Sequence, residues 1–98
     1  QFTGFAPRDL CALWPVPATS SPHPAAPVAP GKVVVVSTTH DPATPYQAGV
    51  NLAHQLGAAL ITYEGAQHTA VFSGNRCVDT AVVRYFVTGT PAPQNLRC

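Results

Sequence analysis

The sequence has no methionine, few charged side chains and no long hydrophobic run. Five residues are Lys or Arg and four are Asp or Glu, which gives a formal net charge of +1. This balance leaves no basic surface for nucleic acid and no polybasic membrane anchor. No apolar run approaches the ~20 residues that a transmembrane helix needs. Because no initiator methionine is present, we expect the chain that begins at Gln1 to be a processed product or an excised piece.

The size and polarity of the chain indicate that it needs a larger partner surface. A chain of 98 residues allows one small domain with a thin core. Hydrophobic residues make up 46% of it and charged residues only 9%, whereas a self-sufficient small domain usually carries more charge on its outside. We therefore expect it to pack on an upstream part of a parent protein. In isolation, an exposed apolar sheet edge could produce a strand-exchanged dimer.

The three cysteines are an odd number, so at least one has no partner within the chain. Cys77 and Cys98 flank a predicted helix and the C-terminal tail, and a disulfide between them would hold a terminal residue that otherwise frays. Cys11 would then pair with a partner outside this chain. Disulfides indicate an exported protein. The alternative is three buried free thiols.

The first third of the chain predicts little regular structure. Residues 15–30 hold six prolines, and proline fixes φ and removes a hydrogen-bond donor, so we predict an extended connector. We expect 1–14 to pack on the missing upstream part, and 31–98 to form the folded subdomain. The residues that could form an apolar helical face before the connector are Phe2, Phe5, Leu10, Leu13 and Trp14.

Residues 31–98 predict an α/β fold. A β-branched run at 33–36 is typical of a strand that is covered on both faces, and Ala59–Tyr63 predicts a second strand. Helices are expected at 45–56, with Thr44 as N-cap, and at 76–88. Strands that alternate with helices run parallel. Two strands alone do not make a stable sheet, so the sheet is expected to continue in another part of the protein.

Asp41 and His68 each follow a predicted strand. Since the carboxyl ends of parallel strands meet at one edge of a sheet, we expect the two side chains to lie close together. A carboxylate that accepts a hydrogen bond from one imidazole nitrogen leaves the other nitrogen free to act as a base for serine. No Gly-x-Ser-x-Gly turn is present. The pattern predicts a triad acid and base without their nucleophile; the alternative is a turn aspartate and a solvated histidine.

Other residues near this pair fit the chemistry less well. Ser37 and Ser73 are the only nearby serines, and neither lies in a nucleophile turn. Glu64 is only four residues before His68, so it cannot easily approach the ring from the opposite strand. We prefer Asp41 as the acid for this reason.

The remaining histidines carry weaker signals. We expect His54 and His23 in solvent, and His40 at a cleft edge or exposed. A zinc site is conceivable, but no close-spaced pair of ligands supports one, and we predict no metal and no cofactor. The residues that such a site would use are His40, Asp41, His68 and Cys77.

Several segments of the chain form a recognisable combination: 39–45 (Thr-His-Asp-Pro-Ala-Thr-Pro), the helix with Ala53 and Leu56, 64–69 (Glu-Gly-Ala-Gln-His-Thr), Cys77, 89–91 (Gly-Thr-Pro) and Cys98. Together they resemble the C-terminal TAP-like domain of secreted tripeptidyl-aminopeptidase-type α/β-hydrolases of actinobacteria, and most of all its mycobacterial members. Residues 11–15 (Cys-Ala-Leu-Trp-Pro) resemble the stretch that precedes this domain. The resemblance covers nearly the whole chain.

The resemblance implies the C-terminal portion of an α/β-hydrolase fold, with Asp41 as triad acid and His68 as triad base. The family's nucleophile and oxyanion hole have no counterpart here. The implied parent is a serine peptidase or esterase, secreted or at the cell envelope, that acts on a peptide or ester, and the chain alone is expected to be inactive. Two alternatives are a non-catalytic binding or assembly module with a relic Asp/His pair, and a parent whose nucleophile has degraded.

Overall fold

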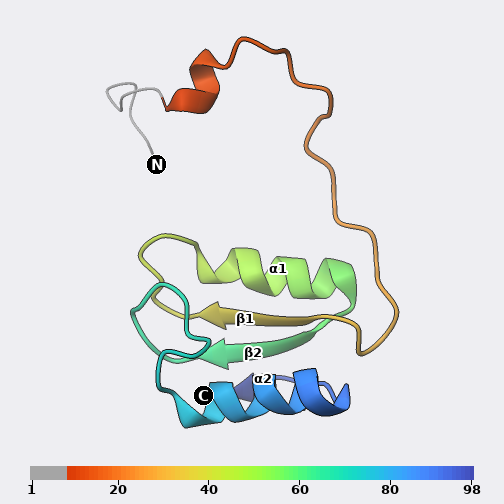
Figure 1. Ribbon diagram of the computed structural model, residues 1–98, viewed down its shortest axis with the longest axis vertical. Coiled ribbons are helices and arrows are strands. Elements are labelled where there is room, and N and C mark those ends of the chain that lie inside the picture. The colour runs from red at the N-terminus through yellow and green to blue at the C-terminus, as the bar shows by residue number, and fades with distance from the viewer. Residues whose placement is uncertain (1–8) are drawn as a thin grey trace.

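The computed structural model describes residues 9–98, which form a small parallel sheet between two helices (Figure 1). The sheet order is β1 (Val34–Thr38), β2 (Ala59–Tyr63) and β3 (Leu96–Arg97), and both pairings are parallel. The parallel α/β arrangement confirms the predicted fold class. The predicted bounds of β2 are also confirmed, whereas β1 begins one residue later and ends two residues later than the predicted 33–36.

Helix α1 (Tyr46–Leu56) connects β1 to β2 and covers one face of the sheet. The Tyr46 hydroxyl lies 2.8 Å from Thr62 Oγ1, and Ser37 Oγ donates to the Tyr46 carbonyl at 3.2 Å. A Cβ at Gly49 would lie 2.3 Å from Ser37 Oγ. The glycine therefore allows α1 to approach the strand end from which the Asp41 loop departs.

The start of α1 corrects one prediction. The helix begins at Tyr46, with Pro45 at the N-cap and no side-chain capping bond. Thr44, the predicted N-cap, uses its hydroxyl to bind the Asp41 carboxylate instead. The charged acceptor makes the stronger hydrogen bond. Gly57 ends the helix at φ 66°, a left-handed conformation that glycine adopts readily.

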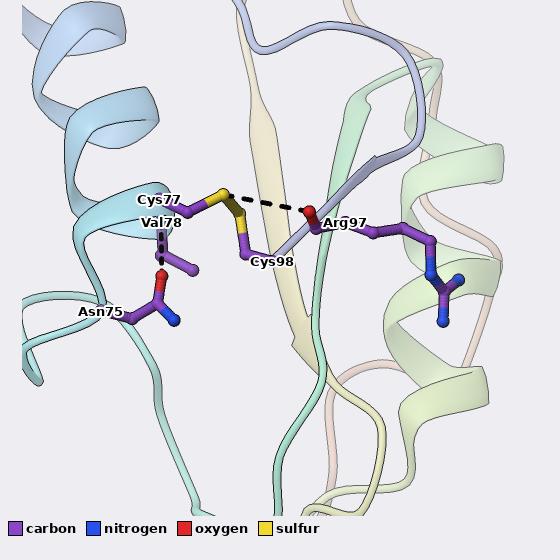
Figure 2. The surroundings of a disulfide bond; sticks show 5 residues. All are labelled: Asn75, Cys77, Val78, Arg97 and Cys98. Atoms are coloured by element: carbon purple, nitrogen blue, oxygen red, sulfur yellow. Dashed lines mark hydrogen bonds between the residues drawn. A yellow bond between two sulfur atoms is a disulfide. The ribbon is translucent and has the colours of Figure 1, made fainter.

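Helix α2 (Arg76–Thr88) covers the opposite face of the sheet (Figure 1). Its bounds match the prediction because both ends are set locally: the Asn75 side chain accepts from the Val78 amide at 2.9 Å (Figure 2), and Gly89 ends the helix at φ 69°. Residues from β2, α2 and the segments around α2 form the hydrophobic core: Ile61, Ala70, Val78, Val82 and Ala92.

A disulfide joins Cys77 in the first turn of α2 to Cys98, as Figure 2 shows. Cys98 follows β3, and its amide donates to the Thr62 carbonyl at 2.7 Å, which extends the pairing of β3 with β2. The sequence did not predict β3. A strand of two residues after Pro91 and Pro93 has no periodic pattern, so only its pairing with β2 identifies it.

The N-terminal part of the described chain makes few contacts with the sheet and its helices (Figure 1). Leu10–Leu13 form a short 3₁₀ helix, capped by Asp9, whose carboxylate accepts from the Ala12 amide at 3.1 Å. Residues 15–30 contain no helix or strand, and the Val28 amide donates to the Leu56 carbonyl at 3.0 Å. Phe2 and Phe5, part of the expected apolar face, lie outside the described residues. No helix in the range 9–98 has the length and apolarity to cross a membrane.

One side of β1 and the outer part of α2 remain open within residues 9–98. The valines at 33–36 are only half-buried, so the expectation of a strand covered on both faces is not met within this range. Phe86 of α2 is 71% exposed. A groove of about 480 Å³ runs along this side, and Val36, Phe72, Tyr85 and Phe86 are among the residues that line it.

Candidate active site

The loops that follow β1 and β2 run side by side. The Thr39 amide donates to the Tyr63 carbonyl at 3.0 Å, and the His40 amide donates to the Gly65 carbonyl at 2.9 Å. These two bonds continue the parallel ladder beyond both strand ends. The sequence places Asp41 and His68 just after this continued ladder, so the sheet itself brings their loops together.

The Asp41 carboxylate is held by the turn that follows it. Oδ1 accepts from the Ala43 amide at 2.7 Å and from the Thr44 amide at 2.9 Å, and Oδ2 accepts from the Thr44 hydroxyl at 2.9 Å. An aspartate that bonds the backbone two residues ahead forms an Asx turn, which the Asp-Pro sequence favours. The Asp41 side chain is only 7% exposed. Its orientation is therefore fixed by bonds within the Asp41–Thr44 turn.

These hydrogen bonds keep Asp41 ionised. The Thr44 amide lowers the pKa of Asp41 most, and the Ala43 amide, His68 and the Thr44 hydroxyl lower it further. Removal of the carboxylate from water acts in the opposite direction, yet the pKa stays well below its ordinary value of 3.8. At neutral pH a negative charge thus lies beside the His68 ring.

His68 faces this charge through one ring nitrogen. Nδ1 lies 2.9 Å from Asp41 Oδ2 and 3.1 Å from Oδ1. Since an ionised carboxylate only accepts hydrogen bonds, Nδ1 must carry the proton. The His68 side chain is 51% exposed, and Nε2 has no hydrogen-bond partner within the described part of the chain. In the neutral ring, Nε2 is the nitrogen with a free lone pair.

The competing acid and nucleophiles make other contacts. Glu64 forms an ion pair with Arg97 of β3. Ser37 Oγ donates to a backbone carbonyl under α1, and Ser73 Oγ donates to the Ala70 carbonyl at 2.6 Å. None of these side chains forms a hydrogen bond with His68 among residues 9–98. Asp41 is therefore the one carboxylate in this range that His68 contacts.

The other histidines lie apart from the pair. His40 is exposed, with Nδ1 3.1 Å from Thr39 Oγ1. His54 is exposed on α1, and the exposed His23 bonds only its neighbour's carbonyl. Across residues 9–98, no three His, Cys, Asp or Glu side chains lie close enough together to hold a metal ion. The conceivable zinc set that included Cys77 is not assembled, because Cys77 is in the disulfide.

Sequence reasoning missed the polar residues that support the pair. Thr44 was expected to cap a helix, and its spacing of three residues from Asp41 was the available signal for an Asx-type turn. The Thr39 hydroxyl accepts from the Gly65 amide and so joins the two loops, whereas the Gln67 amide donates to the Thr69 carbonyl within the His68 loop. The first bond depends on how the two loops approach each other and the second on the folded shape of one loop, so no periodic sequence pattern marks either.

A parallel sheet with a carboxylate and an imidazole paired after adjacent strands defines this chain as part of an α/β hydrolase fold. The sequence model of the TAP-like protein family matches residues 3–98, and the chain belongs to this family. It is 76% identical over 98 residues to carboxylesterase B of Mycobacterium tuberculosis and 56% identical over 100 residues to the serine protease Hip1 of the same species. Each alignment covers 100% of this chain and 19% of the relative.

The chain thus spans about a fifth of the length of these curated relatives. Their names are those of hydrolases, one an esterase and one a protease. The resemblance to mycobacterial TAP-like hydrolases that the sequence motifs indicated is confirmed.

Proposed function

We propose that this chain is the C-terminal part of an exported serine hydrolase and supplies the acid, Asp41, and the base, His68, of its Ser-His-Asp triad. The observation that carries the proposal is the short contact between His68 Nδ1 and Asp41 Oδ2, at 2.9 Å. The half-exposed ring leaves Nε2 available to a serine from another part of the parent protein. The chain order, with Asp before His, is that of α/β-hydrolases.

In the proposed mechanism, the serine of the parent attacks the carbonyl carbon of a peptide or an ester. His68 Nε2 takes the serine proton and then gives it to the leaving amine or alcohol. Asp41 fixes the tautomer of His68 and stabilises the imidazolium that forms. The oxyanion hole lies with the nucleophile, outside this chain. Peptides and esters share this acyl-transfer chemistry, and relatives named as a protease and an esterase support both substrate classes.

The remaining surface features support a place inside a larger hydrolase. The open side of β1 and the apolar groove beside it would receive the upstream part of the parent. Leu13 and Trp14, which are exposed, would pack on the same upstream part, with 15–30 as the connector and 31–98 as the subdomain that carries the pair. Cys11 is exposed and unbonded among residues 9–98, and would pair with an upstream cysteine.

Export is supported by the Cys77–Cys98 disulfide. Disulfides persist in oxidising compartments and are rare in the cytosol. The proposal therefore includes a secreted or cell-envelope location. A protein recovered with Cys77 and Cys98 as free thiols from its native compartment would contradict it.

Fluorophosphonate labelling tests the proposed triad. We expect the chain alone to remain unlabelled and the full parent hydrolase to be labelled on a serine upstream of this chain. His68→Ala should abolish labelling of the parent, and Asp41→Asn should lower its turnover about 10⁴-fold. His54→Ala, which alters an exposed histidine on α1, is the matched control and should retain full activity. Labelling of the chain alone would show that it holds its own activated serine.

A further inference from the structure

The residue after His68 has an unusual backbone conformation. Thr69 lies at φ 64°, in the left-handed region. This region is uncommon for any residue other than glycine, and a β-branched residue there is a true outlier. Such conformations persist only where the surrounding structure holds them, and they concentrate at functional sites. The contacts that hold Thr69 therefore bear directly on the placement of His68.

The Gln67 side chain spans His68 and makes these contacts. Its Nε2 donates to the Thr69 carbonyl at 2.9 Å and to Ser73 Oγ at 2.7 Å. Its Oε1 accepts from the Tyr63 hydroxyl at 3.4 Å. The three partners fix which end of the amide is nitrogen, because the Thr69 carbonyl can only accept and the Tyr63 hydroxyl can donate.

The contacts of Gln67 continue into the rigid part of the molecule. Ser73 Oγ, which accepts from Gln67, donates to the carbonyl of Ala70, a residue of the hydrophobic core with 2% exposure. On the far side of the loop, the Phe72 amide donates to Asp79 Oδ1 of α2 at 2.7 Å. Gln67 thus connects the Thr69 carbonyl to the core through only one intermediate side chain.

We infer that Gln67 is a positioning residue for His68. By holding the Thr69 carbonyl, it keeps the backbone after His68 in the left-handed conformation in which Nδ1 faces Asp41. This inference rests on the proposed function, since it assigns Gln67 a role in orienting the triad base. Gln67 itself forms no hydrogen bond with His68 or Asp41 within residues 9–98, so it acts through the backbone.

Loss of the Gln67 amide has a defined consequence. Without it, Thr69 relaxes toward a negative φ and the His68 ring turns away from the carboxylate. Substrate binding does not depend on this orientation, whereas proton transfer from the serine does. Displacement of a reacting group by 1 Å costs on the order of 100-fold in rate, so kcat falls while KM remains unchanged.

The test uses the full parent hydrolase and an ester substrate. Gln67→Ala is expected to lower kcat about 10- to 100-fold at constant KM. In the Gln67→Ala variant, a second substitution, Thr69→Gly, is expected to restore part of kcat, because glycine adopts positive φ without steric cost. The control is Thr69→Ala in the same variant, which should restore less of kcat because alanine retains Cβ. Gln47→Ala, which removes an exposed glutamine that bonds only Asn51, should leave kcat unchanged.

Several results would overturn the inference. An unchanged kcat in Gln67→Ala would do so, as would a loss that Thr69→Gly and Thr69→Ala restore equally or not at all. Asp41→Asn and His68→Ala, measured in parallel, separate the two proposals. If these two variants retain activity, the proposed triad is wrong; if they lose it while Gln67→Ala does not, only the role of Gln67 is wrong. Thermal unfolding of each variant measures whether a lowered kcat results from loss of the fold.

Discussion

The Thr39 hydroxyl accepts a hydrogen bond from the Gly65 amide at 3.2 Å, and so joins the loop of Asp41 to the loop of His68. The same hydroxyl lies 3.3 Å from the Gly65 carbonyl. Gly65 itself has no room for a side chain, because a Cβ there would lie 2.4 Å from the Tyr63 ring. The Thr39 hydroxyl, two residues before Asp41, and Gly65, three residues before His68, thus add a third connection to the two backbone bonds that hold these loops together.

Thr39→Val in the parent hydrolase is expected to lower kcat about 10-fold, since a shift of less than 1 Å between the loops already misaligns His68. Thr39→Ser keeps the hydroxyl and should retain most of the activity. The comparison of kcat for these two variants is the measurement. Thr80→Val, at an exposed position on α2, is the control. Equal activity of the valine and serine variants would contradict a role for the hydroxyl.

The ionisation of Asp41 predicts how stability changes in acid. Its pKa is held below the ordinary value of 3.8 in the folded protein, chiefly by the Thr44 amide. Because the pKa of Asp41 is lower in the folded than in the unfolded protein, the ionised carboxylate stabilises the fold in full at pH values above 3.8. This stabilisation is lost as the pH falls through the folded-state pKa. The difference in unfolding free energy between the parent and its Asp41→Asn variant should be constant near neutral pH and shrink below about pH 4. Urea unfolding of both proteins over this pH range measures the difference in unfolding free energy. A difference that stays constant down to the lowest pH would contradict the prediction.

The disulfide predicts a local loss of stability when it is removed. Cys77 and Cys98 are 21 residues apart, and a bridge that closes a loop of this size stabilises by about 3 kcal/mol in the chain-entropy model. The double variant Cys77→Ser/Cys98→Ser should therefore show faster hydrogen exchange at the amides of α2 and β3. The amides of α1, on the opposite face, serve as the internal control. Unchanged protection of α2 would contradict this prediction.

The close approach of α1 to β1 predicts that Gly49→Ala destabilises the protein. Alanine normally favours a helix over glycine, but a Cβ at position 49 would lie 2.6 Å from Ser37 Cβ as well as 2.3 Å from its Oγ. We expect a cost of about 1–3 kcal/mol, as for an overpacked site. Adding Ser37→Gly should restore stability, whereas Ser37→Ala should not, because it retains Cβ. A melting temperature raised by Gly49→Ala alone would show that the strand and helix separate without cost.

Local sequence determined the features that depend on short-range physics. The apolar β-branched and helical patterns gave β2 and α2 their bounds, because Asn75 and Gly89 end α2 through bonds within one turn. The positions of Asp41 and His68 after adjacent strands also follow from the sequence. Residues that directly follow neighbouring parallel strands lie at the same edge of the sheet, and this placement does not depend on the side chains around them.

Tertiary structure alone decided which contacts these residues make. Strand β3 is identified only by its pairing with β2, and the bond between the Thr39 hydroxyl and the Gly65 amide forms only because the sheet places the two loops side by side. The left-handed Thr69 is held by the Gln67 amide, whose other partners are the Ser73 hydroxyl and the Tyr63 hydroxyl of β2. Such contacts join groups that the sequence pattern does not relate, so they are fixed by the geometry of the folded chain rather than by any local preference.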